Sequence, residues 1–335
     1  MKAVSFAETG GPEVLVYGDL PDPTPTDTQV VVAVRACGIC GHDSADRAGL
    51  AHIPLPAVLG HEIAGDVVAV GSAVRGFAVG DRVACKQFHT CGRCLPCRSG
   101  DELSCAQKEF TYGGGAEYVA LEQDTLLSVP DGVDYADAAL TACAVGTCLQ
   151  ALDRIGTLRP GETAVITGAG GGLGLHAMQV AKAMGARVIG LTSSPQKAEL
   201  LGRHGADEVV VSGPELATQL LDLTGGRGPE VVLDNVGHPD VFGPCFRALA
   251  RRGRYVLTGQ LYRQKISLFP AFVFFKEAVI TGSGSTLMST FMRSMELVES
   301  GKVRPVTQTY ALSDAVEAHE AVDASRVVGR AILVP

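Results

Sequence analysis

Four of the ten cysteines form a closely spaced group in one polar loop. Their spacing is Cys-x2-Cys-x2-Cys-x7-Cys, and the four residues are Cys91, Cys94, Cys97 and Cys105. Thiolates packed within fifteen residues can form a closed tetrahedral shell, which is the arrangement that structural zinc prefers. An iron–sulfur cluster also takes four cysteines and is the alternative chemistry. The spacing therefore predicts a structural metal site, with zinc favoured, that leaves no ligand position open for a substrate.

A glycine-rich segment follows a short apolar run that ends at Ile166 and precedes a helical stretch through Met184. Glycines let the backbone approach a pyrophosphate, whose negative charge is stabilised at the N-terminus of the helix. The segment follows Gly-x-x-Gly-x-x-Gly instead of the strict Gly-x-Gly-x-x-Gly pattern. It predicts a dinucleotide site formed by Gly168, Gly170, Gly171, Gly172, Leu173 and Gly174.

The next expected strand, residues 187–191, ends without the acidic residue that usually binds the ribose hydroxyls of NAD. Residues that can bind a 2′-phosphate stand there instead, namely Thr192, Ser193, Ser194 and Lys197. NADP(H) is therefore favoured over NAD(H); the alternative for Lys197 is an ordinary solvated residue in the first turn of a helix. The nicotinamide half is expected at the carboxyl ends of later strands, where the chain has Asn235, Gly237, Thr258, Gly259 and Ser283.

Composition limits the class of protein that carries these motifs. The 335 residues are 46% hydrophobic and 19% charged, which fits a compact chain of about two domains. The formal net charge is −8 and no basic stripe is present, so we expect a small-molecule partner and no nucleic acid. The first twelve residues lack the apolar run of a signal peptide, and no stretch is typical of a membrane span. We expect a cytoplasmic protein.

The elements that position these motifs change character along the chain. Before about residue 147 the sequence is β-rich, with β-branched runs at 30–34, 63–70 and 118–121. From residue 163 short apolar runs alternate with helical stretches, which predicts a doubly wound parallel sheet. The segment after residue 284 does not extend this alternation and is assigned to the first domain. The expected domains are 1–147 with 285–335, and 148–284.

This alternation gives specific boundaries. The expected strands of the parallel sheet are 163–167, 187–191, 208–211, 230–233, 253–258 and 278–282. The expected helices between them are 173–184, 195–203, 214–223 and 240–250. Beyond the sheet we expect helices at 289–299 and 313–322 and a last strand at 327–333.

Five segments follow one another along the chain, namely Cys37-Gly-Ile-Cys-Gly-His-Asp43, Gly60-His-Glu62, Gly80-Asp-Arg-Val83, the four-cysteine loop and Gly113-Gly-Gly-Ala-Glu-Tyr118. In this order they resemble the motifs of the zinc-containing medium-chain dehydrogenase/reductase family. With the glycine-rich segment, the resemblance covers essentially the whole chain. It implies an α/β protein with a GroES-like β-rich catalytic domain and a doubly wound Rossmann coenzyme domain.

The resemblance also implies a second metal site, whose ligands lie far apart in the sequence. Family members hold a catalytic zinc on residues matching Cys40, His61 and Cys143, with the residue matching Glu62 beside it or as a transient fourth ligand. Three protein ligands leave a position where an alcohol or carbonyl oxygen can bind a Lewis acid. Asp43 would accept a hydrogen bond from the second ring nitrogen of His61 and fix its tautomer. The alternative for Cys143 is a buried cysteine without a metal.

His42 stands where the alcohol dehydrogenases of this family usually carry a Ser or Thr that moves the alcohol proton. Histidine can exchange protons near neutral pH, so His42 is a candidate relay. The alternative is a surface histidine. The relay histidine that some family members carry five residues after the first ligand is replaced here by Ala45.

The favoured function is that of an alcohol dehydrogenase or carbonyl reductase with two zinc ions per chain, one structural and one catalytic. The alternative is an NADPH-dependent reductase of activated carbon–carbon double bonds, of acryloyl-CoA/enoyl or quinone type, that holds only the structural zinc. Segments 167–174 and 234–237 resemble those reductases as well. A dinucleotide-binding protein without turnover is a third hypothesis. The apolar segment 269–275 favours a homodimer or homotetramer, unless it packs within the chain.

Overall fold

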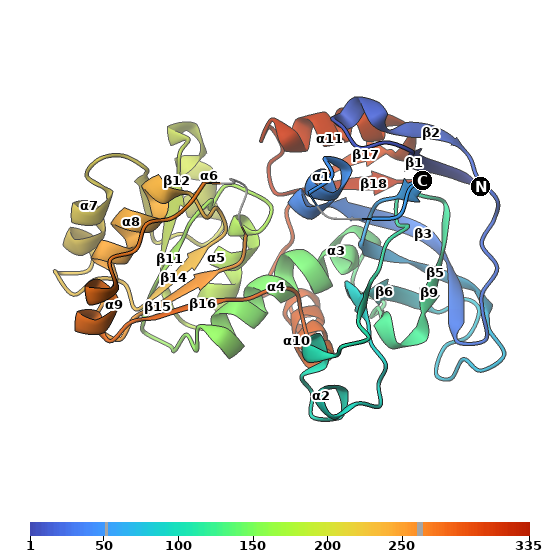
Figure 1. Ribbon diagram of the computed structural model, residues 1–335, viewed down its shortest axis with the longest axis horizontal. Helices are drawn as coiled ribbons and strands as arrows, with labels where there is room; N and C mark the ends of the chain where they lie inside the picture. The colour runs from blue at the N-terminus through green and yellow to red at the C-terminus, as the bar shows by residue number, and fades with distance from the viewer. Residues whose placement is uncertain (51–52, 260–263) are drawn as a thin grey trace. The chain divides into compact units, whose positions relative to one another are not determined.

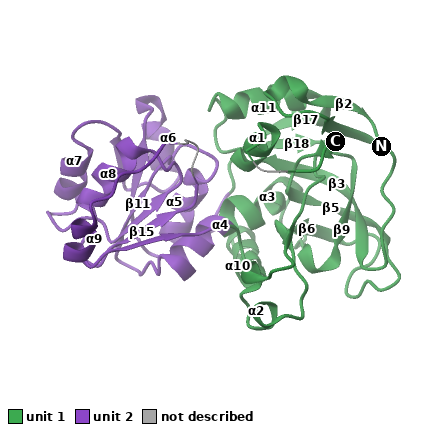
Figure 2. Cartoon of the chain, viewed as in Figure 1, with its two compact units in different colours: residues 1–146, 285–301, 305–335 green, residues 147–284, 302–304 purple. Residues whose placement is uncertain are grey.

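The structure, a computed structural model, describes residues 1–50, 53–259 and 264–335 (Figure 1). The chain divides into two compact units (Figure 2). Unit 1 consists of residues 1–146, 285–301 and 305–335. Unit 2 consists of residues 147–284 and 302–304. The chain therefore builds most of unit 1, then unit 2, and returns to complete unit 1.

Unit 1 is organised by a mostly antiparallel seven-stranded sheet around the long strand β3 (Gln29–Ile39). The β-branched residues of β3 are buried, because the strand pairs with β5, β9 and β18. The other strands of this sheet are β5 (Glu62–Val70), β6 (Arg82–Cys85), β9 (Tyr118–Glu122), β10 (Leu126–Ser128), β17 (Thr307–Ala311) and β18 (Arg330–Val334). The expected strands at 30–34, 63–70 and 118–121 are confirmed.

Smaller elements complete unit 1. Two short sheets are formed by β1 (Lys2–Phe6), β2 (Val16–Asp19) and β4 (Ala57–Val58), and by β7 (Phe88–His89) and β8 (Glu109–Phe110). The helices are α1 (Gly41–Arg47), α2 (Leu95–Arg98), α3 (Tyr135–Leu140), α10 (Met288–Glu299) and α11 (Ala315–Asp323). A π-helical turn, Thr141–Val145, continues α3. The expected helices at 289–299 and 313–322 and the last strand are confirmed to within three residues.

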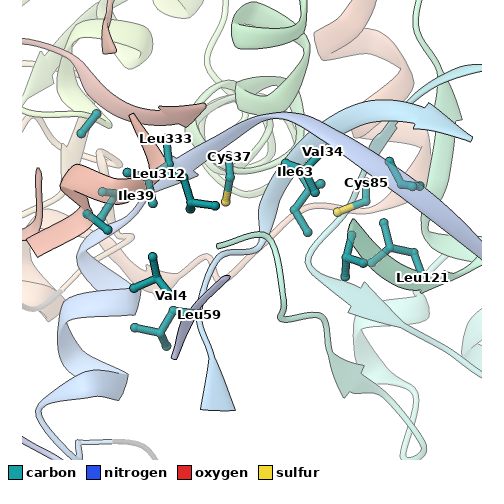
Figure 3. Packing of buried hydrophobic residues seen from close by; sticks show 14 of the residues in the cluster. Val4, Val34, Cys37, Ile39, Leu59, Ile63, Cys85, Leu121, Leu312 and Leu333 are labelled. Carbon is teal, nitrogen blue, oxygen red and sulfur yellow. The ribbon is translucent and has the colours of Figure 1, made fainter. Parts of the chain in front are cut away.

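The core of unit 1 joins segments that are distant in sequence. Figure 3 shows Cys37, Ile63 and Leu333, from β3, β5 and β18, in one apolar cluster. Cys37 and Cys85 are each 1% exposed in this cluster. Burial raises the pKa of the Cys85 thiol to about 12, so this cysteine behaves as a small apolar side chain.

Unit 2 contains a six-stranded, entirely parallel sheet with the order β13-β12-β11-β14-β15-β16. The strands are β11 (Thr163–Ile166), β12 (Arg187–Thr192), β13 (Glu208–Val211), β14 (Val231–Asp234), β15 (Arg254–Leu257) and β16 (Val279–Gly282). Central strands such as β14 are buried along their whole length, as strands covered on both faces must be. This order is that of a doubly wound Rossmann sheet, which confirms the expected fold class.

The helices of unit 2 alternate with its strands. They are α5 (Gly174–Ala183), α6 (Ala198–Arg203), α7 (Leu216–Leu223), α8 (Pro239–Ala248) and α9 (Pro270–Lys276). The short helix α4 (Gly146–Leu149) and a π-helical turn (Gln150–Ile155) precede the first strand. Helix α9 overlaps the segment 269–275, for which the sequence predicts an apolar surface and no particular secondary structure.

Some elements carry no clear sequence signal. Strand β17 lies at an edge of its sheet, where three of its first four side chains are exposed, so it lacks the apolar pattern of a buried strand. The turn Thr141–Val145 lies within one long apolar run, in which periodicity does not separate regular α-helix from a π-helical turn.

Candidate active site

Three elements of unit 1 bring the dispersed ligand residues together. Cys40 immediately precedes helix α1, His61 immediately precedes strand β5, and Cys143 lies in the π-helical turn. The Sγ atom of Cys143 lies 3.9 Å from Sγ of Cys40 and 3.8 Å from Nε2 of His61. With a carboxylate oxygen of Glu62, these atoms all lie within 4.8 Å of one another. Bonds of about 2.3 Å to a tetrahedral zinc separate two sulfurs by about 3.8 Å, so the donor set fits this metal.

Asp43 orients the imidazole of His61. Its Oδ1 lies 3.1 Å from Nδ1 of His61 and accepts a hydrogen bond from the Gly60 amide, while Oδ2 accepts one from the Cys40 amide at 2.7 Å. Nδ1 therefore carries the proton, and Nε2 presents its lone pair to the sulfurs. Burial raises the pKa of Asp43, but the interaction with the His61 ring and the hydrogen bond from the Cys40 amide outweigh this effect and bring the value to about 2.

Glu62 adds a buried carboxylate to the group. Its Oε1 lies 3.2 Å from Nη2 of Arg330, and both side chains are almost completely buried. Burial raises the pKa of Glu62 to about 7, although the charge of Arg330 opposes this shift. A Cβ atom at Gly38 would lie 2.1 Å from Oε2 of Glu62, so the glycine makes room for the carboxylate.

His42 lies beside the ligand group on the first turn of α1. Its side chain is 49% exposed, and its Nε2 lies 3.4 Å from Oδ2 of buried Asp46. The ring stacks on Phe110, with centroids 4.9 Å apart and planes 14° apart. The same Asp46 oxygen accepts a hydrogen bond from the hydroxyl of Tyr112 at 2.9 Å. The imidazole thus connects a buried carboxylate with solvent.

The four-cysteine loop forms a second, separate group of ligands in unit 1. The Sγ atoms of Cys94 and Cys97 are 3.4 Å apart, and those of Cys105 and Cys91 are 3.6 Å apart. All four sulfurs lie within 4.8 Å of one another, as the shell of a tetrahedral zinc requires. Amide hydrogen bonds from the two residues after Gly92 lower the pKa of Cys91 to about 6, which favours the thiolate. The four cysteines that the spacing groups are thus brought together.

The glycine-rich segment lies between β11 and α5 in unit 2. Gly168 has a φ of 57°, and a Cβ atom there would lie 2.9 Å from the Val236 side chain. A Cβ atom at Gly174 would lie 2.2 Å from the Gly168 carbonyl oxygen. Both positions therefore require glycine, and the chain turns directly into the N-terminus of α5. The segment has the geometry of a phosphate-binding turn.

The residues after β12 lie close to this turn. Nζ of Lys197 lies 3.4 Å from the Gly170 carbonyl oxygen, which places a positive charge next to the glycines. Thr192 accepts a hydrogen bond from the Ser194 amide, and Ser193 is exposed. No acidic side chain occupies positions 192–197.

A buried hydrogen-bond network joins the carboxyl ends of three strands of the same sheet. Asn235 donates to the Thr167 carbonyl at 2.9 Å and accepts from the Thr258 hydroxyl at 2.6 Å. Asp234 accepts from Thr167, from the hydroxyl of Tyr255 and from the amide of Gly237. These bonds hold Asn235, Gly237 and Thr258 at the edge where coenzyme binds in such sheets. Gly259 packs against the Asn235 backbone, whereas Ser283 stands separately at the end of β16.

Comparison with known proteins gives the family. Residues 26–131 match the model of the alcohol dehydrogenase GroES-like domain, and residues 172–300 match that of zinc-binding dehydrogenases. An acryloyl-coenzyme A reductase of Sulfurisphaera tokodaii is 32% identical over 326 residues, which are 95% of each chain. A quinone oxidoreductase of Pseudomonas aeruginosa is 35% identical over 348 residues, covering 100% of this chain and 99% of the relative. The crystal structure of an NAD-dependent alcohol dehydrogenase is 34% identical, covers 100% of both chains and has a TM-score of 0.94.

The chain belongs to the zinc-containing medium-chain dehydrogenase/reductase family. The resemblance to this family is therefore confirmed, as is the α/β class with GroES-like and Rossmann parts. The chain is accordingly an oxidoreductase by family. Its relatives act on different kinds of substrate, so family membership alone does not give the reaction.

Several residues of this dehydrogenase/reductase site have no signal in the sequence. Arg330 lies on the last strand, far from Glu62 along the chain. Asp46 and Tyr112 meet only in the folded chain. Asp234 has a weak signal, because it begins the segment Asp234-Asn-Val-Gly237.

Among the described residues, none of the helices is both long and apolar enough to span a bilayer.

Proposed function

We propose that this medium-chain dehydrogenase/reductase is a zinc-dependent alcohol dehydrogenase or carbonyl reductase. The observation that carries the proposal is the convergence of Cys40, His61 and Cys143 within ligand distance of one point. Nε2 of His61 lies 3.8 Å from Sγ of Cys143, and Asp43 orients the imidazole as carboxylates do for metal-binding histidines. The alternative of a buried Cys143 without a metal does not explain this arrangement.

Each group at the site has a distinct chemical role. When bound, zinc supplies a Lewis acid that polarises a substrate oxygen, and the nicotinamide coenzyme gives or takes the hydride. Asp43 keeps the His61 lone pair directed at the ligand position. Glu62, held by Arg330, is close enough to serve as a transient fourth ligand when no substrate oxygen occupies that position.

His42 is proposed to carry the substrate proton to solvent. The half-exposed imidazole stands between the ligand group and water, and its Nε2 lies 3.4 Å from Oδ2 of Asp46. Replacement His42→Ala is expected to lower kcat by about 10²-fold, the usual contribution of a positioned acid or base. His42→Ser, which restores the hydroxyl usual in the family, is expected to recover part of this loss. Equal kcat values in the wild type and His42→Ala would mean that His42 does not transfer the proton and is only a surface histidine.

The preferred coenzyme is proposed to be NADP(H). The support is the ammonium of Lys197 beside the glycine turn, together with the absence of a carboxylate after β12. Lys197→Ala is expected to weaken NADPH binding by about tenfold and to leave NADH binding nearly unchanged, because the 2′-phosphate contact contributes about 1.4 kcal/mol. Titration calorimetry with both coenzymes measures this difference. Equal losses of affinity for NADH and NADPH would mean that Lys197 does not contact the 2′-phosphate.

A second candidate function is the NADPH-dependent reduction of an activated carbon–carbon double bond. The specific observation in its favour is His42, which replaces the hydroxyl residue of typical alcohol dehydrogenases. The relatives described as acryloyl-coenzyme A reductase and quinone oxidoreductase support the same possibility. This reaction needs no metal at Cys40, His61 and Cys143.

A substrate panel separates the two functions. Aldehydes, ketones, enoyl thioesters and quinones are offered with NADPH to the wild type and to Cys40→Ala. Reduction of carbonyl substrates that the variant loses would support the zinc-dependent function. Reduction of enoyl thioesters or quinones that the variant retains would establish the second candidate instead.

The protein is further proposed to form a homodimer or homotetramer. Helix α9 exposes large apolar side chains, with Phe274 at 73% and Phe275 at 72%. Strand β16 ends the sheet of unit 2, and its Val279 is 50% exposed. A second copy would cover these residues of unit 2. Sedimentation of the wild type beside Phe274→Ser tests whether they hold the assembly together.

A further inference from the structure

Glu102 connects the four-cysteine loop with helix α10. It lies between Cys97 and Cys105, and its side chain is largely buried. Its carboxylate accepts a hydrogen bond from the amide of Met288, the first residue of α10. Nζ of Lys86 lies 4.0 Å from the same oxygen. The loop thus reaches a segment nearly two hundred residues away in the sequence.

Helix α10 needs such an acceptor at its start. The first amides of any helix lack partners within the helix, and a capping side chain usually supplies one. The residue before Met288 is Leu287, which makes no side-chain capping bond. Glu102 therefore supplies both the acceptor and a negative charge at the positive end of the helix.

The same helix holds the turn that carries Cys143. The hydroxyl of Thr286, just before α10, donates to the Ala142 carbonyl at 2.6 Å. The hydroxyl of Ser294, within α10, lies 2.6 Å from the Thr141 carbonyl oxygen and 2.7 Å from the Phe291 carbonyl oxygen, so its single proton is shared between the turn and the helix. A π-helical turn departs from regular α-helical hydrogen bonding, so outside donors stabilise its carbonyls. Thr286 also packs closely on Gly146, where a Cβ atom would lie 2.9 Å from its hydroxyl.

We propose that Glu102 is a positioning residue for the candidate catalytic site. It fixes the start of α10, and α10 fixes the backbone around Cys143 through Thr286 and Ser294. The four-cysteine loop therefore does more than stabilise its own fold, since it keeps one ligand of the other group in place. The effect on metal binding rests on the proposed function, whereas the effect on the backbone around Cys143 does not.

Hydrogen exchange measured by mass spectrometry tests the connection without reference to activity. In Glu102→Ala, the peptide covering residues 141–146 is expected to exchange about tenfold faster than in the wild type. Glu102→Gln retains a carbonyl acceptor for Met288 and should restore most of the protection. Glu109→Ala, which removes an exposed glutamate just after the loop, is the matched control and should change nothing there.

A purely local role gives a different result. If Glu102 only caps its helix, exchange in Glu102→Ala rises over residues 288–291 and stays at the wild-type rate over 141–146, which overturns the proposal. Thr286→Val and Thr286→Ser provide a second pair in case Glu102→Ala does not fold. The valine variant should expose residues 141–146 to exchange, and the serine variant, which keeps the hydroxyl, should protect them. Unchanged exchange in Thr286→Val also overturns the proposal.

Metal retention provides a second readout. In the wild type, the rate at which a colorimetric chelator removes zinc should show two phases, one for each ligand group. Glu102→Ala should release the metal of the Cys40 group about 10-fold faster, in the range found for residues that support metal ligands. A wild type that holds a single zinc would contradict the proposed function, while the exchange experiment would still decide the role of Glu102.

Discussion

The two groups of cysteine-containing ligands in unit 1 use similar atoms and are built in different ways. The four-cysteine loop takes its sulfurs from a short segment, with Cys91 and Cys105 only 14 residues apart, and three of its four residues are partly exposed. The other group joins Cys40 and Cys143, which are 103 residues apart, and three of its four residues are buried. The first group consists of four cysteine sulfurs, whereas the second, the mixed group, combines two cysteine sulfurs, an imidazole and a carboxylate.

This difference is what we expect if the loop has a structural role and the second group has the proposed chemical one. Four thiolates satisfy a tetrahedral metal without help, so the loop needs few supporting side chains. The mixed group needs Asp43 to orient His61 and Arg330 to balance Glu62, because buried charged groups require partners. Under the proposed function, such supporting residues would also tune the metal that the mixed group holds.

The largest expected contrast is in activity. Cys40→Ala should lower kcat/KM for carbonyl reduction by at least about 10³-fold, because the loss of a Lewis acid removes several kcal/mol of transition-state stabilisation. Cys94→Ala, in the other group, should keep much more of the activity. Steady-state kinetics on both variants measures the contrast. Similar losses in both variants would mean that the two groups do not have separate roles.

The reverse contrast is expected in stability. Cys94→Ala should lower Tm by several degrees, because the loop depends on its metal for its fold. Cys40→Ala should change Tm less, since its surroundings remain packed by the apolar core of unit 1. Thermal unfolding followed by circular dichroism gives both values. A larger drop in Tm for Cys40→Ala than for Cys94→Ala would contradict the structural role proposed for the four-cysteine loop.

Asp43→Asn sharpens the comparison at the mixed group alone. The amide can no longer stabilise the orientation of His61 as a carboxylate does, so zinc affinity at this group should fall by about 10- to 100-fold. Affinity at the four-cysteine loop should remain at its wild-type value. Competition with a chelator measures both, with the exposed Asp131→Asn as the control. Unchanged zinc affinity at the mixed group would mean that Asp43 is not needed to orient His61 for metal binding.

The smallest expected effect is a pH dependence near the mixed group. Burial lowers the pKa of His319 from 6.5 to about 4. Between these values the unfolded chain binds a proton that the folded chain does not, so stability is full above pH 6.5 and falls as the pH decreases toward 4. His319 alone contributes a loss of about 2 kcal/mol from pH 7 to pH 5, and the raised pKa of Glu62 opposes this loss. Urea unfolding at both pH values should show a change in the free energy of unfolding that is more favourable in His319→Gln than in the wild type by about this amount. An equal change in both proteins would mean that His319 does not contribute.

The two groups also differ in how far the sequence predicts them. Local spacing is enough for Cys91 to Cys105, because four cysteines in one loop have few other arrangements. Cys40, His61 and Cys143 are joined only by the resemblance to a family, since residues 82 and 103 positions apart share no local pattern. The parallel sheet of unit 2 is predictable because apolar strands and helices alternate regularly.

The features that the sequence does not predict are mostly polar contacts between residues far apart in the chain. Arg330, Asp46 and Glu102 act through partners that only the folded chain brings near them. Their residue types are common on protein surfaces, so nothing in the sequence marks them as buried. The π-helical turn around Cys143 is hidden in the same way, within an apolar run that also fits an ordinary helix.

The number of zinc ions per chain tests the proposed catalytic zinc most directly. Elemental mass spectrometry is performed on wild type, Cys40→Ala and Cys94→Ala, each purified without added metal. We expect about two zinc ions in the wild type and one in each variant, with carbonyl reduction lost only in Cys40→Ala. One zinc in both the wild type and Cys40→Ala, with none in Cys94→Ala, would contradict the catalytic zinc and leave double-bond reduction as the function to pursue.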